Sequence, residues 1–201
     1  GALEISSSFE NISKYSFNRI KYFDHFEPEL VFIRNDLIFF DKKGSIIRFD
    51  EKSKIKWKVN HYNKKEKKLP PILKIAKVGN NLLITDNLAK LYLLDASNGK
   101  LIWKNEHKVF FISQIKVDRD RFYVLDASNI FTCYSLSNGK KIWEFKGETK
   151  LINSQQQTSV IINNENVIFN NSKGEIISLD KMSGNLNWLT PTIEYGESLQ
   201  S

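Results

Sequence analysis

One pattern of sixteen residues occurs four times in this chain without an internal gap. Each copy is followed by a tryptophan seven or eight residues later, and successive tryptophans are 46, 40 and 45 residues apart. The copies are Asn35–Asp50, Asn80–Asp95, Asp120–Ser135 and Glu165–Asp180, and the tryptophans are Trp57, Trp103, Trp143 and Trp188. A period in this range with several short apolar runs is typical of β-propeller blades. The repeat therefore predicts an all-β fold, a β-propeller with four-stranded antiparallel blades, of which about four are present.

Short apolar runs alternate with turn residues inside each copy. In the second copy the runs Leu82–Thr85 and Leu91–Leu94 are separated by a turn that opens at Asp86, and a second turn, Asp95–Gly99, follows them. Apolar runs of about four to six residues between Asn, Asp and Gly predict β-hairpins. The middle strand is apolar on both faces, as expected for a strand that is covered on both sides.

The turn residues recur by type in all four copies. The first turn opens with Asp41, Asp86, Asp126 and Asn171, whose side chains we expect to accept a nearby main-chain N–H. The second turn closes four residues before the tryptophan with Gly99, Gly139 and Gly184, where a positive φ is expected, and the first copy has Ser53 there. Unrelated hairpins in a β-sandwich are the alternative, and the gapless register argues against them.

The repeat also predicts the boundaries of the blades. A fourth strand should precede each copy, at Glu29–Ile33, Ile72–Val78, Ile112–Val117 and Ser159–Ile162. The resulting organisation is an N-terminal lead-in at 1–27, which could supply a ring-closing strand, and a propeller region at 28–190. The four blades are expected at 28–60, 69–106, 109–147 and 155–190, and residues 191–201 are expected to begin a fifth blade or form a tail.

Composition agrees with a folded protein that carries an uneven charge. The chain has 201 residues, 41% of them hydrophobic, and its net charge is +7. That length can bury a sizeable core, and no apolar stretch of about 18 residues suggests a membrane span. No secretory signal is visible at Gly1.

The positive charge is concentrated in one part of the chain. Residues 1–150 hold 28 basic and 18 acidic residues, and the densest basic run is Lys64–Lys68. That run either contacts phosphate of nucleic acid or lipid headgroups, or forms a solvated loop between blades.

The residue types needed for catalysis are sparse and scattered. Cys133 is the one cysteine, and its position on a middle strand predicts a buried, inert thiol. His25, His61 and His107 lie far apart in the sequence, and no HExxH, GxSxG, P-loop or GxGxxG motif is present. We therefore expect no catalytic residue, no metal and no cofactor, and no nucleic-acid module is visible. The tryptophans either stack on a ligand or pack between neighbouring blades, and their repetition favours packing.

Three segments give the chain a family resemblance. LYLLDASNGKLIW, FTCYSLSNGKKIW and GEIISLDKMSGNLNW resemble the quinoprotein-type propeller repeat, in which each blade ends with D-x-x-[ST]-G-x-x-x-W. The enzymes with this repeat, quinone-dependent alcohol dehydrogenases, are much longer and carry calcium, the quinone and commonly a ring formed by two adjacent cysteines. The entry to the first blade, FEPELVFIRNDLIFFDKKGSIIRFDEKSKIKW, is instead similar to the BamB family of outer-membrane assembly lipoproteins.

That resemblance implies a function without catalysis. It implies a periplasmic scaffold at the outer membrane of a Gram-negative bacterium, which binds the periplasmic domains of the barrel-assembly outer-membrane protein and could receive unfolded outer-membrane proteins. The contact loop of the family corresponds here to Leu151, Ile152, Asn153, Ser154 and Gln155, with Leu151 and Ile152 as apolar anchors. The arginine of the family has no match in this loop, where Asn153 stands near its place. A polar connector with incidental aliphatic residues is the alternative.

Four blades would form half of an eight-bladed ring, and three explanations of this number stay open. The chain could be part of a longer protein, two copies could associate as half-rings, or four blades could close alone. The expected function is a protein–protein scaffold. The alternatives are a piece of a quinone-dependent dehydrogenase and a ligand-sensing propeller domain.

Overall fold

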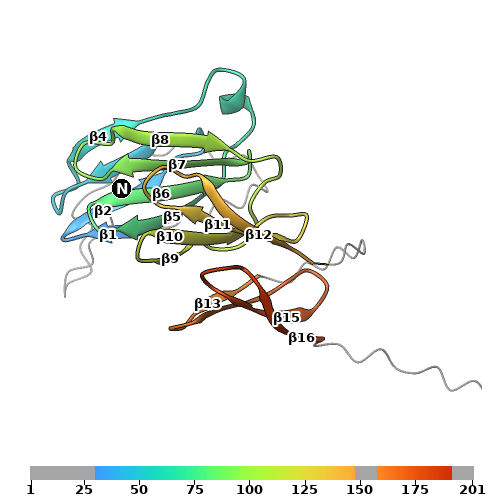
Figure 1. The fold of residues 1–201 in the computed structure, drawn as a ribbon. Helices are drawn as coiled ribbons and strands as arrows, with labels where there is room; N and C mark the ends of the chain where they lie inside the picture. The colour runs from blue at the N-terminus through green and yellow to red at the C-terminus, as the bar shows by residue number, and fades with distance from the viewer. Residues whose placement is uncertain (1–29, 148–157, 192–201) are drawn as a thin grey trace, which may run out of the picture. The chain divides into compact units, whose positions relative to one another are not determined.

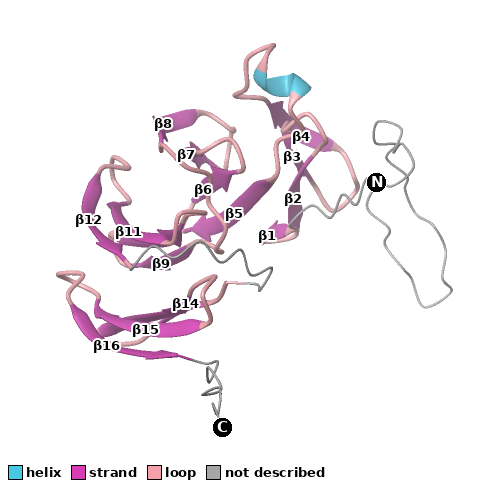
Figure 2. Cartoon of the chain, turned by 90° about the vertical axis from the view of Figure 1, so that its right-hand side faces the viewer, coloured by secondary structure: helices cyan, strands magenta, loops and turns pink. Residues whose placement is uncertain are grey.

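The computed structural model describes residues 30–147 and 158–191 (Figure 1). Their strands form four separate sheets, each with four antiparallel strands. In this part of the chain the only helix is the single 3₁₀ turn η1, Glu66–Lys68 (Figure 2). These sheets confirm the predicted all-β class and the expected number of blades. The lead-in at 1–27 and residues 192–201 lie outside the described residues.

The chain divides into two compact units, Gly1–Glu106 and His107–Ser201, each with two sheets. In the first unit the strands are β1 (Val31–Ile33), β2 (Asp36–Phe40), β3 (Ile46–Phe49), β4 (Ile55–Val59), β5 (Leu73–Val78), β6 (Asn81–Asp86), β7 (Lys90–Asp95) and β8 (Leu101–Glu106). In the second they are β9 (Lys116–Asp118), β10 (Arg121–Leu125), β11 (Ile130–Ser135), β12 (Lys141–Lys146), β13 (Val160–Ile162), β14 (Asn166–Asn170), β15 (Glu175–Asp180) and β16 (Leu186–Pro191). Every sheet follows the chain order, so each blade is a meander of three consecutive hairpins.

The four blades share one hydrogen-bond register. Each tryptophan on the last strand lies opposite the same position of the third strand, and the register shifts directly after that position. The pairs are Arg48–Trp57, Leu93–Trp103, Cys133–Trp143 and Ser178–Trp188. A bulge repeated at one place increases the local twist of every blade in the same way. The sixteen-residue pattern is therefore a structural unit and not a coincidence of composition.

The first turn of every blade is closed by its opening side chain, as the sequence predicts. Oδ1 of Asp41 accepts the N–H groups of Lys43 and Ser45 at 3.0 and 2.9 Å. Asp86, Asp126 and Asn171 accept the equivalent two N–H groups in the same way. One carboxylate or amide oxygen thus satisfies two turn donors in each blade.

The first strand of the third blade differs from the prediction. It was expected at Ile112–Val117, but β9 is Lys116–Asp118. Phe111 forms an isolated bridge with Asp126, and the N–H groups of Ile112 and Ser113 both donate to the carbonyl of Leu125. The hydroxyl of Ser113 accepts the N–H of Leu125 at 2.8 Å. This side chain replaces a ladder hydrogen bond and interrupts the strand, which apolar periodicity alone does not predict.

Each unit has its own apolar core between its two sheets. In the first unit Ile38, Phe40, Leu82 and Leu94 are among the fully buried members. In the second unit the rings of Phe131 and Phe169 stack with centroids 4.0 Å apart and planes 5° from parallel. The third strands β7 and β11 are buried on both faces along most of their length, as predicted.

Cys133 is buried in this second core, which confirms the expected buried thiol. Burial raises its pKa to about 11, so the thiolate needed for reactivity is disfavoured at neutral pH. Among residues 30–147 and 158–191, no helix combines the length and the apolar character that a membrane crossing needs.

Candidate functional site

The segment of residues 60–72, called the connector here, joins β4 to β5 and carries η1. Oδ1 of Asn63 accepts the N–H groups of Lys65 and Glu66 at 2.9 and 3.0 Å. Oε2 of Glu66 accepts the N–H of Asn63 at 2.8 Å. This exchange has the reciprocal form of a capping box, and it orders the turn from Asn63 to Glu66 that leads into η1.

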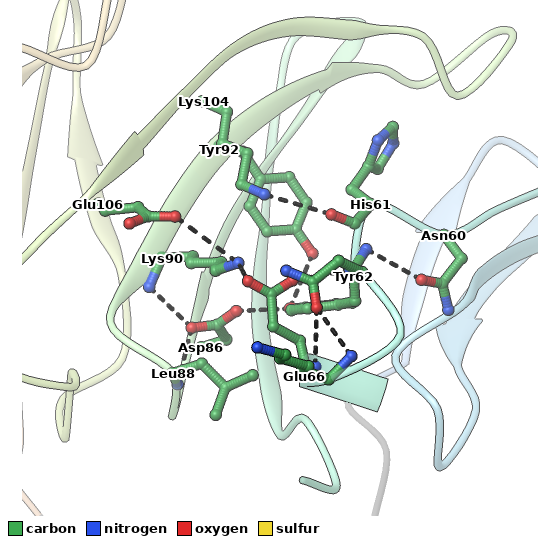
Figure 3. Close-up of polar contacts among 12 residues, drawn as sticks. Asn60, His61, Tyr62, Glu66, Asp86, Leu88, Lys90, Tyr92, Lys104 and Glu106 are labelled. Atoms are coloured by element: carbon green, nitrogen blue, oxygen red, sulfur yellow. Dashed lines mark hydrogen bonds and ion pairs between the residues drawn. The ribbon is translucent and has the colours of Figure 1, made fainter. Parts of the chain in front are cut away.

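The connector is fastened to the second blade by buried side chains (Figure 3). Tyr62 is 4% exposed, and its hydroxyl donates to Oδ2 of Asp86 at 2.5 Å. The hydroxyl of Tyr92 lies 3.3 Å from that of Tyr62. Asp86 therefore uses one oxygen to close its own turn and the other to hold a residue 24 positions earlier in the chain.

A second attachment is ionic. The ammonium of Lys90, whose side chain is 6% exposed, pairs with Oε1 of Glu66. Glu106 lies 3.7 Å from the same ammonium, and Lys104 donates from Nζ to the carbonyl of His61 at 3.2 Å. The single acidic side chain of the Lys64–Lys68 run is thus turned toward the second blade (Figure 3).

Burial and neighbouring groups together set the direction in which each of these pKa values shifts. Burial raises the pKa of Asp86, although the hydrogen bond from Tyr62 opposes that rise. Burial lowers the pKa of Lys104, and the neighbouring Lys90 lowers it further. For Lys90 burial acts to lower the pKa, but the contacts with Glu66 outweigh burial and raise it. The hydrogen bond from Lys90 lowers the pKa of Glu66. Glu66 and Lys90 are therefore a charged pair at neutral pH.

The outer side of the connector has a different character. Lys64, Lys65, Lys67 and Lys68 are all exposed. Leu69 and Ile72 are 58% and 56% exposed, on either side of two prolines. On the inner side Tyr62 and Glu66 therefore have hydrogen-bond or ionic partners, although the buried Nε2 of His61 has none among the described residues, whereas the exposed residues are cations and aliphatic side chains.

The second unit attaches its own connecting residue in a related way. Nε2 of His107 lies 2.9 Å from Oδ2 of Asp126, and Nδ1 lies 2.8 Å from the hydroxyl of Tyr134. Tyr62 follows its blade tryptophan by five residues and His107 follows its own by four. Both bind the aspartate that opens a first turn, so these side chains act as structural fasteners.

The repeat tryptophans and glycines lie at two sheet-to-sheet contacts that the structure describes. Nε1 of Trp57 donates to the carbonyl of Ala96 at 3.1 Å. A Cβ atom on Gly99 would lie 3.0 Å from Cε3 of Trp57, and one on Gly184 would lie 2.6 Å from the Trp143 ring. In each unit the indole of one blade therefore lies against the turn glycine of the next.

The remaining repeat residues lie at the equivalent positions. Trp103 is half-buried on β8, Trp188 is 45% exposed on β16, and Gly139 has a φ of 66°. Ser53 adopts the glycine conformation with a φ of 61°. The predicted contact residues Leu151, Ile152, Asn153, Ser154 and Gln155 lie outside the described residues.

Sequence reasoning did not single out Tyr62, Glu66 and Lys90. The capping-box spacing of Asn63 and Glu66 was a usable signal, but it was hidden in a lysine run. Over residues 30–147 and 158–191, no group of three or more His, Cys, Asp or Glu side chains could hold a metal ion. The connector is thus attached to the second blade through Tyr62 and Glu66, while its lysines, Leu69 and Ile72 face solvent and are free to contact another surface.

Comparison with known proteins identifies the repeat. The family model described as "Outer membrane protein assembly factor BamB" matches residues 42–197. An uncharacterized protein of Rickettsia conorii is 26% identical over 178 residues, which cover 87% of this chain and 42% of that protein. The chain thus spans less than half the length of this curated relative.

Solved structures share the fold at low sequence identity. BamB from Moraxella catarrhalis matches with a TM-score of 0.65 and 17% identity, over 81% of this chain and 48% of that one. Quinohemoprotein alcohol dehydrogenase from Comamonas testosteroni matches with a TM-score of 0.64 and 11% identity, over 81% and 34%. The Cps50 (Swd1) β-propeller domain of Myceliophteria thermophila matches with a TM-score of 0.59 and 13% identity, over 80% and 53%. The predicted β-propeller class is confirmed.

Proposed function

Because the chain belongs to the BamB family of outer membrane protein assembly factors, we propose that it is a non-enzymatic protein–protein scaffold in the assembly of outer-membrane β-barrels. The observation that carries the proposal is the family match over residues 42–197, more than half of the chain. The proposed location is the periplasm, in association with the outer membrane. The proposed partners are the periplasmic domains of the barrel-assembly outer-membrane protein and unfolded outer-membrane proteins.

The architecture of the described blades supports a scaffold. The inner strands of each blade are hydrogen-bonded on both edges and supply the apolar cores, and the repeated first turn is closed by a side chain of its own blade. The segments between blades are therefore the parts of the chain that can vary in sequence without disturbing the sheets. A protein of this kind recognises partners through connectors that a rigid framework positions.

The proposed contact loop is Leu151–Gln155, which joins the third and fourth blades. It contains two adjacent aliphatic residues, Leu151 and Ile152, followed by polar residues. Aliphatic anchors surrounded by polar side chains suit a protein interface with a small apolar centre. This assignment rests on the family resemblance and on the sequence of the loop.

A membrane-free pull-down tests both the function and the loop. The full chain should capture the purified periplasmic domains of the barrel-assembly protein, and Leu151→Asp with Ile152→Asp should lose that capture. Leu69→Asp with Ile72→Asp introduces the same change in another connector and should leave it intact. No capture by the unsubstituted chain would overturn the scaffold function. If both double variants captured the partner equally well, the assignment of Leu151–Gln155 as the contact loop would be wrong, but the scaffold function would stand.

The similarity to a quinohemoprotein alcohol dehydrogenase supports a second candidate function. The match to the quinohemoprotein alcohol dehydrogenase fits a fragment of a quinone-dependent enzyme as well as a scaffold. Calcium-dependent quinone binding at micromolar concentration would favour that enzyme class. A small molecule retained in native mass spectrometry would instead favour a ligand-sensing propeller. We expect neither result, and either one would contradict the scaffold function.

A further inference from the structure

We propose that the outer side of the connector docks on an anionic phospholipid surface, with Lys64, Lys65, Lys67 and Lys68 contacting the phosphates and Leu69 and Ile72 entering the interface. All four lysines are exposed, and both aliphatic side chains are more than half exposed. The connector carries η1 beyond the ends of the neighbouring strands of the first unit (Figures 1 and 2). The proposal goes beyond the scaffold function and does not rest on it.

The connector is held in one shape before any ligand arrives. Its middle is fixed by the Glu66–Lys90 ion pair and by the reciprocal Asn63–Glu66 hydrogen bonds. Its far end is fixed by Asn87, whose Oδ1 accepts the N–H of Ile72 at 2.8 Å and whose Nδ2 donates to the carbonyl of Pro70 at 3.2 Å. Much of the ordering cost of binding is therefore met during folding.

The charge of the outer side is of a single sign. Glu66, the one acid in the run, points inward and is neutralised by Lys90. Next to the connector, the side chain of Lys43 is exposed. The backbone carbonyl of Lys43 accepts a hydrogen bond from Nδ2 of Asn60 at 2.9 Å. Asp41 is buried and pairs with Lys58 at 3.1 Å. Glu106 is 69% exposed, and its carboxylate lies 3.7 Å from the ammonium of Lys90, the counter-ion of Glu66.

The residue types favour a lipid surface over a protein or a nucleic acid. Protein interfaces favour aromatic residues and arginine and contain few lysines, and nucleic-acid sites add stacking aromatics. The aromatic ring of the connector, Tyr62, is buried. Lysine is a compact, mobile charge that suits a diffuse layer of phosphates, and exposed aliphatic side chains gain free energy when they enter the interface. Each lysine near an anionic surface strengthens binding by roughly five-fold.

Vesicle co-sedimentation of the full chain tests the proposal. We expect binding to vesicles of equal parts phosphatidylglycerol and phosphatidylcholine, no binding to pure phosphatidylcholine, and weaker binding as salt increases. Changing all four lysines to glutamine should weaken binding at least ten-fold. The matched control changes to glutamine Lys52, Lys54, Lys77 and Lys100, which are also exposed and lie in the same unit, and it should weaken vesicle binding much less.

The apolar contribution needs its own variant. Leu69→Ser with Ile72→Ser should weaken vesicle binding several-fold at constant charge, whereas Ile55→Ser with Ile102→Ser, at two other exposed positions, should not. Three results would overturn the proposal: no binding to the anionic vesicles, equal losses in the connector and control variants, or tighter lysine-dependent binding to polyglutamate or DNA than to the vesicles. Circular dichroism of each variant checks that the sheets are retained.

Discussion

The hydroxyl of Tyr62 lies 2.5 Å from the carboxylate of Asp86, although the two residues are 24 positions apart in the chain. Asp86 opens a turn that every blade shares, whereas Tyr62 belongs to the segment between blades. This hydrogen bond therefore joins a repeated element to a unique one. It is the means by which a regular sheet fixes the shape of an irregular connector.

Removal of the Tyr62 hydroxyl should destabilise the protein. Tyr62→Phe leaves Oδ2 of buried Asp86 without the donor described here, which should lower the free energy of unfolding by about 1–3 kcal/mol. Tyr92→Phe removes a hydroxyl that lies 3.3 Å from Tyr62 and should cost less. Urea unfolding measures both, and an equal or larger loss in Tyr92→Phe would contradict this account.

Asp86→Asn should change how stability depends on pH. The folded-state pKa of Asp86 is raised, so the stability that this group contributes is full below its unfolded pKa near 3.9 and is lost as pH rises through the folded pKa. Asparagine does not ionise, and Asn171 already closes the same turn in the fourth blade. The variant should therefore gain stability relative to the parent as pH rises above about 4.

Urea unfolding of parent and variant at a series of pH values tests this expectation. Groups with lowered pKa values, such as Glu66, act in the opposite sense but are common to both proteins. Their contribution cancels in the difference between the two free energies of unfolding. A difference that stays constant over the series would show that Asp86 does not titrate as described.

The contact between indole and glycine should tolerate no added methyl group. Gly99→Ala places a Cβ atom 2.8 Å from Val59 and 3.0 Å from Trp57, and Gly99 has a φ of 74°. Gly79 has a φ of 57° with no neighbour within 4 Å, so Gly79→Ala isolates the backbone strain of about 1–2 kcal/mol. Thermal unfolding should show a clearly larger loss for Gly99→Ala, and equal losses would mean that the packing is loose.

The Glu66–Lys90 ion pair should protect the connector from cleavage by trypsin. Lys90→Met leaves Glu66 without its buried counter-ion and should cost about 2 kcal/mol, less than for a fully buried pair because Glu66 is partly exposed. The four exposed lysines of the connector are trypsin sites, so cleavage there should become faster in the variant. Glu66→Gln combined with Lys90→Met should restore part of the resistance, since it removes the unpaired charge. Unchanged cleavage in Lys90→Met would contradict the anchoring role.

Much of the blade structure could be predicted because it is local and repeated. A turn closed by Asp41 or Asn171 needs only residues two and four positions later in the chain. The first strand of the third blade was predicted at the wrong residues because the hydroxyl of Ser113, and not a backbone carbonyl, accepts the N–H of Leu125. Apolar periodicity indicates which residues are buried, but it does not indicate where a side chain takes the place of a backbone hydrogen-bond partner.

The sequence by itself determined the all-β class, the four-stranded blades, the turn chemistry and the burial of Cys133. Repetition makes these visible, since the same short-range interactions recur at fixed spacing. Tertiary structure alone decided that Glu66 turns inward to Lys90 while its lysine neighbours face solvent. It also decided that Tyr62 reaches Asp86 and that the Trp57 indole lies on Gly99. These contacts join segments far apart in the chain, and their partners are selected by the packing of one sheet on the next, which no local pattern encodes.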